Sequence, residues 1–115
     1  MSPFELTVQH LAGDAVQLQM RGSLDLAFAY RFDEALRRVE RDGADPLVID
    51  LSRVEFLDST GISRLVAARR RARRAGRRLV LVRGPVAIQR LFQIVALEEC
   101  FEFVPDVSTF EVGHA

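Results

Sequence analysis

The residues best placed to do chemistry lie between positions 56 and 62, in the segment FLDSTGI. An apolar stretch turns there through small polar residues into an apolar pattern of helical spacing, so Ser59 is expected at the amino end of a helix. The simplest interpretation is a helix cap, because a serine oxygen at this position accepts a hydrogen bond from a free backbone amide. Position 62 is Ile instead of Glu or Gln, so the reciprocal capping box is absent and the cap interpretation is weakened.

The chemical alternative for Ser59 is a nucleophile, which needs a neighbouring base. The only histidines are His10, in the first predicted strand, and His114, near the end of the sequence, and neither is a credible partner. The glycine spacing also misses the G-x-S-x-G turn of serine hydrolases. The run from Asp58 to Gly61 is one residue too long for the D-[ST]-G loop of aspartic proteases. We therefore expect no enzymatic activity.

Composition excludes several other kinds of site. One cysteine and two distant histidines make no metal-ligand cluster, so we expect no metal and no cofactor. The absence of lysine removes P-loop and Schiff-base chemistry. Cys100 lies in an apolar stretch and is predicted to fill the core of a protein from a reducing compartment. Asp50 and Asp58 could form a carboxylate pair, but they are interpreted as turn and strand-end residues.

A second small polar turn, residues 22–25 with the sequence GSLD, precedes the first predicted helix. Asp25 is suited to cap that helix. Both polar turns follow a strand and precede a helix, and the carboxyl ends of strands in α/β sheets commonly carry binding sites. The sequence therefore predicts that residues 22–25 and the Ser59 turn lie side by side at one rim.

A basic run crosses the end of the second predicted helix, and its members are Arg69, Arg70, Arg71, Arg73, Arg74, Arg77 and Arg78. Helical spacing puts most of them opposite the apolar face, as expected of a solvated surface whose stems cover apolar groups. RNA, acidic lipid or an acidic protein partner remain alternatives for this run. The formal net charge of zero and the lack of interleaved aromatic residues argue against nucleic acid as the main partner.

Periodicity predicts the elements that must position these residues. Alternation over residues 4–8 and 16–20 indicates a hairpin turning at Gly13-Asp14, and buried strands are expected at 47–51, 79–82 and 101–104. Helical spacing predicts helices over residues 28–42, 59–75, from 86 through Val95, and 106–112. The order ββαβαβαβα predicts an α/β fold with a mixed, mostly parallel sheet of 4–5 strands flanked by 3–4 helices, in one domain over residues 1–115.

The sequence carries no signal for secretion or for a membrane span. Residues 1–3 pass directly into the alternating pattern without a basic start and an apolar core. No apolar run exceeds five residues, whereas a spanning helix needs about 20. We expect a cytoplasmic protein without a membrane span.

These residues resemble the STAS-domain family, specifically the bacterial anti-sigma-factor antagonists, over residues 4–110. The resemblance centres on the DSTG run at 58–61, preceded by VIDLS at 48–52, with Gly22 and Leu24-Asp25 upstream. Strand 79–82, Leu91-Phe92 and Phe101-Glu102 also fit.

The resemblance implies that Ser59 is phosphorylated and that the partner is an anti-sigma factor with serine kinase activity, with a PP2C-type phosphatase restoring the free hydroxyl. It places Asp25, Asp58, Thr60, Gly61 and Ser23 at the contact surface with Ser59. Thr60 is an alternative phosphate acceptor. Ser23 stands where the family often has glutamate, which affects partner specificity, and Val95-Ala96 replaces a frequent Thr-Gly in a connection. The alternative within the family is a scaffold of a sensory complex or an accessory subunit of a lipid-transport ATPase.

Overall fold

The computed structural model describes residues 4–111. Five strands form within this range: β1 (Glu5–His10), β2 (Val16–Leu24), β3 (Leu47–Leu57), β4 (Leu79–Val82) and β5 (Glu102–Val104). The helices are α1 (Ala29–Arg41), α2 (Ser59–Ala75), α3 (Val86–Ile94) and α4 (Ser108–Glu111), with a 3₁₀ turn, η1, at Glu98–Cys100. The predicted element order is confirmed. The predicted last helix reached Val112, which lies outside the described residues.

The strands lie in the sheet in their order along the chain, β1-β2-β3-β4-β5. β1 and β2 form the predicted antiparallel hairpin, and β2 through β5 pair in parallel. Each parallel crossover carries a helix or turn, as such connections require. The carboxyl ends of β2 and β3 therefore meet at one edge, where Leu24 lies opposite Leu57.

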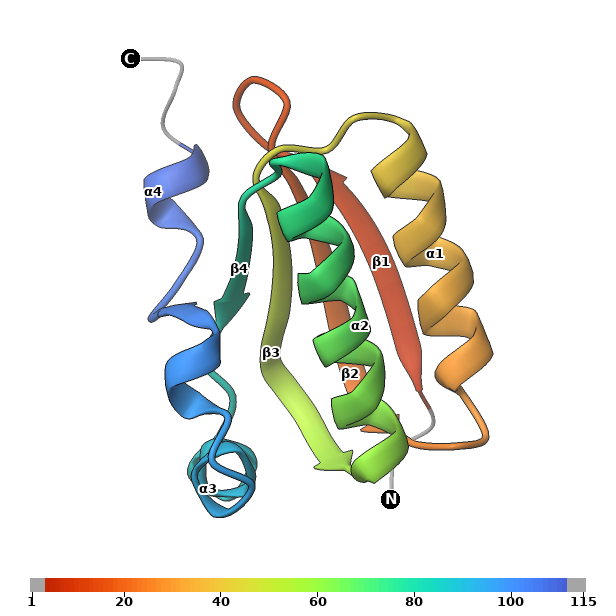
Figure 1. The fold of residues 1–115 in the computed structure, drawn as a ribbon, viewed down its shortest axis with the longest axis vertical. Coiled ribbons are helices and arrows are strands. Elements are labelled where there is room, and N and C mark those ends of the chain that lie inside the picture. Colours follow the sequence, from red (N-terminus) through yellow and green to blue (C-terminus); the bar gives the residue numbers. More distant parts are fainter. Residues whose placement is uncertain (1–3, 112–115) are drawn as a thin grey trace.

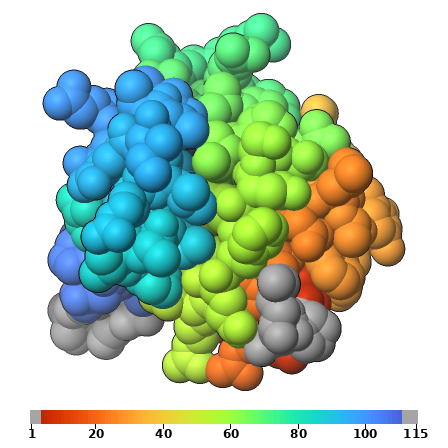
Figure 2. Space-filling model, turned by 90° about the horizontal axis from the view of Figure 1, so that it is seen from below, coloured from red at the N-terminus to blue at the C-terminus, as the bar shows by residue number. Residues whose placement is uncertain are grey.

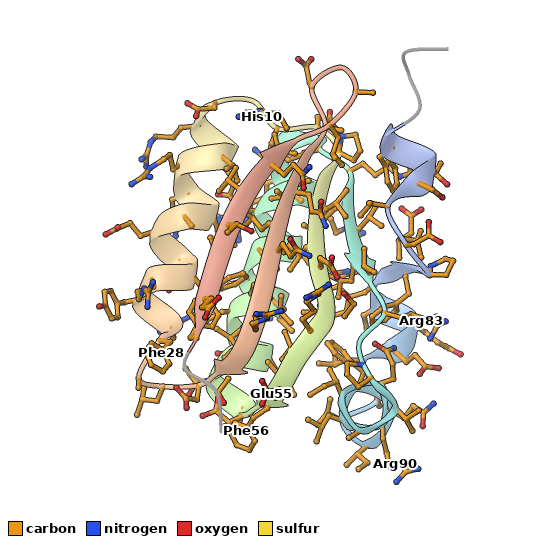
Figure 3. All side chains as sticks on the ribbon, turned by 180° about the vertical axis from the view of Figure 1, so that it is seen from behind. His10, Phe28, Glu55, Phe56, Arg83 and Arg90 are labelled. Atoms are coloured by element: carbon orange, nitrogen blue, oxygen red, sulfur yellow. The ribbon has the colours of Figure 1, made fainter. Side chains whose placement is uncertain are left out.

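Helices α1 and α2 cover one face of the sheet, and the main hydrophobic core lies between them and the strands (Figure 1). Fully buried members of this core include Leu18, Phe32, Leu36, Ile49, Leu65 and Phe92. On the reverse face, α4 covers the region of β3 and β4 through Phe110, which packs with Val48, Val80 and Val82. Over β1 and β2 this reverse face carries no helix (Figure 3).

β3 is longer than predicted, because pairing with β2 continues through Ser23↔Phe56 to Leu24↔Leu57. Exposed polar residues in this second half hide the strand pattern in the sequence, although Val54 and Leu57 are buried. The extension delivers the chain to the start of α2 without a separate loop. The polar turn therefore belongs to the joint between strand and helix.

Predictions about three single residues were wrong. Cys100 lies at the end of η1 and is exposed, so it fills no core position. Asp50 is a buried residue in the middle of β3, where it accepts hydrogen bonds from Gln17 Nε2 at 2.9 Å and from the Ser52 amide at 2.8 Å. The predicted helical position of Val95 was also wrong, because α3 ends at Ile94 and Val95 is 44% exposed.

Candidate functional site

The candidate site is the rim where β2 and β3 end and α2 begins. Seen along the molecule from this end, the segment that starts α2 lies between the β2–α1 connection on one side and the region of α3 on the other (Figure 2). Two backbone contacts join the start of α2 to the β2–α1 connection. The Asp58 amide donates to the Leu24 carbonyl at 3.4 Å, and β2 and β3 pair as far as Leu24 and Leu57. The two polar turns therefore lie side by side at one rim, as predicted.

Asp58 organises this rim. It is the N-cap of α2, and its Oδ1 accepts a hydrogen bond from the Gly61 amide at 2.9 Å. Its Oδ2 accepts from the Leu26 amide at 3.3 Å, across the gap to the β2–α1 connection. One carboxylate thus satisfies a free helix amide and also fixes the neighbouring turn. The alternative that Ser59 caps α2 was wrong, because Asp58 takes that position.

Ser59 is the first residue of α2 and is exposed to solvent. It lies at the end of the helix where the backbone amides and the macrodipole present positive potential. Thr60, next to it, is half-buried, and its carbonyl accepts a hydrogen bond from Ser63 Oγ at 2.8 Å. Of the two hydroxyls, Ser59 is the more open to another macromolecule.

The predicted cap of α1 by Asp25 was wrong, and Ser23 is not at the surface. Asp25 Oδ1 accepts from the Ala27 amide at 3.0 Å, so it closes a local turn; α1 begins only at Ala29, after Phe28, without a side-chain cap. Ser23 lies inside β2 and is 2% exposed, because its side chain is covered where β2 pairs with β3. It cannot contact a partner in this conformation, which corrects its assignment to the contact surface.

Gly61 is buried and brings α2 close to the end of β2. A Cβ atom at this position would lie 2.5 Å from Leu57 Cδ1 and 2.7 Å from the Leu24 carbonyl oxygen. Because the second of these atoms belongs to the backbone, no side-chain rotation relieves the clash. Gly61 therefore allows α2 to pack closely against β2, and it lies away from the surface that a partner could contact.

Exposed apolar side chains that the sequence did not single out lie on the segments next to the Ser59 turn and on α3. Leu26 is 74% exposed and follows Asp25, and Phe56 is 41% exposed at the end of β3 (Figure 3). On α3, Val86 and Ile94 are 74% and 71% exposed, each one turn from Arg90 on the same helical stripe. Leu26 is an apolar residue directly after the polar turn at residues 22–25, so the sequence could have drawn attention to it. Phe56 could be placed only once β3 was known to continue.

Within residues 4–111, no group of three or more His, Cys, Asp or Glu side chains is arranged to hold a metal ion. His10 is exposed at the end of β1, the strand end remote from the start of α2 (Figure 3), and His114 lies outside the described residues. None of the described helices has the length and apolar character needed to cross a bilayer.

The basic run is divided among several environments. Arg70, Arg73 and Arg74 are exposed, as predicted for a solvated face. Arg71 is different: its Nε and Nη2 donate to the Glu40 carboxylate at 2.9 and 3.0 Å, which joins α2 to α1. Arg78 forms an ion pair with Glu102 at the start of β5.

Comparisons with known proteins agree with this architecture. The family model described as "Mlab, STAS domain" matches residues 7–105. The chain is 36% identical over 96 residues to the anti-sigma-F factor antagonist RsfB of Mycobacterium tuberculosis, which covers 84% of this chain and 77% of that protein. It is 25% identical over 83 residues to the anti-sigma-B factor antagonist of Staphylococcus aureus, covering 72% and 77% of the two chains.

Solved structures show the same fold. An anti-sigma factor antagonist from Mycobacterium paratuberculosis superposes with a TM-score of 0.84 at 26% identity, covering 93% of this chain and 90% of the other. SpoIIAA in its unphosphorylated form gives a TM-score of 0.77 at 14% identity, covering 91% and 92%. Its phosphorylated form, from Bacillus, gives 0.72 at 14% identity, covering 91% and 96%. The family match over residues 7–105 and the 36% identity to RsfB together show that this chain belongs to the STAS-domain family.

Proposed function

We propose that this protein is an anti-sigma-factor antagonist that binds an anti-sigma factor with serine kinase activity, and that phosphorylation of Ser59 ends the complex. One observation carries the proposal: Ser59 is exposed at the first position of α2, while Asp58 does the capping. Its hydroxyl is thus not needed to hold the helix. The names of the relatives, an anti-sigma-F and an anti-sigma-B factor antagonist, support the class of partner.

The unmodified rim suits a protein partner. Leu26, whose amide binds Asp58, and Phe56, near the end of β3, are exposed on the segments next to Ser59, and α3 adds exposed Val86 and Ile94. Exposed apolar groups that gather beside polar ones mark interaction surfaces more often than scattered ones do. Burial of these side chains by the partner would supply most of the affinity, and Ser59 would be desolvated beside them.

Phosphorylation would change the charge of this surface without removing a contact inside the fold. The phosphate adds a charge of about −1.5 to −2. The helix dipole favours it by roughly 0.3 to 1 kcal/mol. The Asp58 carboxylate opposes it, because two unit charges about 4 Å apart repel by about 1 kcal/mol in water and about 4 kcal/mol at an effective dielectric of 20. SpoIIAA, which shares this fold, is known in an unphosphorylated and a phosphorylated form, and this supports a modification that leaves the fold intact.

When a partner covers the rim, the phosphate and the Asp58 carboxylate affect the free energy of binding more strongly than they affect folding. A partner that covers the rim removes water from both the phosphate and Asp58, and buried charges without partners cost several kcal/mol. Every ~1.4 kcal/mol is a tenfold change in affinity. The phosphorylated protein would therefore leave its partner while staying folded.

The proposed cycle has two chemical steps. The Ser59 hydroxyl attacks the γ-phosphorus of ATP held by the partner; the new O–P bond forms as the bond to ADP breaks, and the serine proton is released. A PP2C-type phosphatase then hydrolyses the phosphoserine with water, which yields inorganic phosphate and the free hydroxyl. After the first step the released anti-sigma factor binds its sigma factor again. After the second step this protein binds the anti-sigma factor, and the sigma factor is released.

The test uses the kinase-fold anti-sigma factor encoded in the same genome, mixed with this protein and ATP. Intact-mass measurement should show a gain of one phosphate in the wild type and in Thr60→Ala, and none in Ser59→Ala. Ser59→Ala should hold the partner in the presence of ATP, and Ser59→Glu should bind it at least tenfold more weakly.

Two results would overturn the proposal. Equal affinities of Ser59→Ala and Ser59→Glu for the partner would remove Ser59 from the switch. A pull-down from cells that recovered a transporter ATPase or a sensory-complex protein, with no kinase-fold partner, would assign the protein to the alternative within the family.

A further inference from the structure

A second candidate site lies at the opposite end of α2 from Ser59. An open cleft of about 280 Å³ is bounded there by the last turns of α2, the start of β4 and the segment from η1 to β5. We call it the arginine cleft and define it by Arg69, Arg73, Arg77, Arg78 and Glu102. Because the two ends of α2 lie at opposite edges of the sheet (Figure 1), this cleft is separate from the rim that carries Ser59.

The chain places these arginines together by spacing. Arg69 and Arg73 are four residues apart on α2, so they project on the same stripe. Gly76 then ends the helix in the left-handed conformation, with φ of 68°, and the Arg77 amide donates back to the Ala72 carbonyl at 2.8 Å. This reversal brings Arg77 and Arg78 to the cleft that the helical arginines already line.

The cationic charge of the cleft is mostly uncompensated. Arg78 is paired with Glu102, and this hydrogen bond raises the pKa of Arg78 and lowers that of the Glu102 carboxyl. Arg69, Arg73 and Arg77 form no ion pair with any residue between 4 and 110. Moreover, Arg77 Nη1 is buried and has no hydrogen-bond acceptor among the protein atoms of that range. A buried guanidinium donor that lacks an acceptor is unfavourable, and an anion would supply one.

The other arginines of the run do not share this arrangement. Arg70 and Arg74 are exposed and lie outside the cleft, and Arg71 is occupied by Glu40. A solvated helix face explains Arg70 and Arg74 well. It does not explain why three unpaired guanidinium groups line one concavity, or why one of them, that of Arg77, has a buried donor without an acceptor.

We propose that the arginine cleft binds the phosphate group of a small soluble molecule. Guanidinium groups form paired hydrogen bonds with phosphate oxygens, and three of them match a group carrying two or more negative charges. The helix C-terminus contributes about half a negative charge, which opposes anions but is outweighed by the three cations. At about 280 Å³ the cleft falls at the small end of ligand sites, so it has room for a diphosphate and a small part of the molecule that carries it.

The test is titration of the purified protein with inorganic pyrophosphate, with binding measured by calorimetry and by the change in melting temperature. Saturable binding should appear below 10 mM ligand and raise the melting temperature, because a ligand that binds only the native state stabilises it. The variant Arg69→Gln/Arg73→Gln should bind at least tenfold more weakly. The control, Arg70→Gln/Arg74→Gln, removes the same charge from the same helix outside the cleft, and its affinity should change less than threefold.

Adenosine diphosphate in a second titration distinguishes the source of the phosphate. Equal affinity for the two ligands would show that the cleft contacts only the phosphate groups. Tighter binding of adenosine diphosphate would show that it also contacts the adenosine. Absence of saturable binding by either ligand up to 10 mM would overturn the proposal. Equal weakening in the two double variants would do the same, because it would show a diffuse charge effect instead of a site. Neither result bears on Ser59.

Discussion

At the scale of single residues, Asp58 and Ser59 divide two tasks that sequence reasoning gave to one residue. Asp58 accepts from Gly61 within its own helix and from Leu26 across the rim. That arrangement leaves the Ser59 side chain outside the hydrogen bonds that hold the turn. A modifiable hydroxyl can therefore sit at a structurally critical joint without being part of its support.

Replacing Asp58 should test this division. Asp58→Ala removes both accepted hydrogen bonds and should lower the free energy of unfolding by about 1 to 2 kcal/mol, as loss of a helix cap does. Asp58→Asn keeps one acceptor oxygen for the Gly61 amide, where asparagine is an equally good cap, and loses only the longer bond from the Leu26 amide, so it should lose less stability than Asp58→Ala. Urea denaturation measures both. Equal losses in the two variants would show that the hydrogen bond from Gly61 contributes little to the stability of the rim.

Gly61 gives a second prediction at this scale. In Gly61→Ala the added carbon would lie 2.5 Å from Leu57 Cδ1 and 2.7 Å from the Leu24 carbonyl oxygen. We expect a loss of about 1 to 3 kcal/mol in the free energy of unfolding, as for overpacked sites. Ser63→Ala, at an exposed position two residues further along α2, is the control and should cost less than about 0.5 kcal/mol. A stable Gly61→Ala would mean that α2 can move away from β2.

The position of Ser59 could be predicted from the sequence, because small polar residues between a strand and a helix constrain the local backbone strongly. The environment of Ser23 could not. Whether a serine near a strand end is exposed depends on how far the next strand continues beside it, and β3 continues to Leu57 through a stretch that reads as polar. The same long-range pairing places Phe56 at the rim. Local signals thus located the hydroxyl, and only pairing between strands located the surface around it.

At the scale of elements, α1 and α2 are joined by a pair of charged groups that is largely shielded from water. The side chains of Arg71 and Glu40 are 20% and 9% exposed, and two parallel hydrogen bonds connect them. The sequence shows a row of similar arginines and gives no sign that one of them faces inward. Helical spacing alone cannot identify that residue, because it depends on where α1 lies.

Arg71→Ala should therefore cost about 2 to 4 kcal/mol of stability, since it leaves the Glu40 carboxylate mostly buried without its partner. Arg70→Ala, its exposed neighbour, should cost less than about 0.5 kcal/mol. Chemical denaturation of both variants at neutral pH provides the comparison. If the two variants lost equal stability, the ion pair between the helices would be energetically irrelevant.

At the scale of the whole molecule, the proposed switch predicts a change in recognition with no change in stability. Ser59→Glu adds a negative charge at an exposed position, where the helix dipole favours it by about 0.3 to 1 kcal/mol and Asp58 opposes it by about 1 kcal/mol in water, so the net change in the free energy of unfolding should stay below about 1 kcal/mol. In a domain of this size that corresponds to a shift in melting temperature of less than about 8 °C. Circular dichroism on heating measures it. A fall of more than about 10 °C would indicate that charge at position 59 acts by unfolding the protein.

The order of strands in the sheet bears on how the chain can be assembled during synthesis. Every strand after β1 pairs with the strand that precedes it, so no later segment has to insert between two earlier ones. A chain that emerges from the ribosome amino end first can extend an existing sheet edge one strand at a time. The segments that form the Ser59 joint, from β2 to α2, are all translated before β4 begins, so this joint can be complete before the last third of the chain has been synthesised.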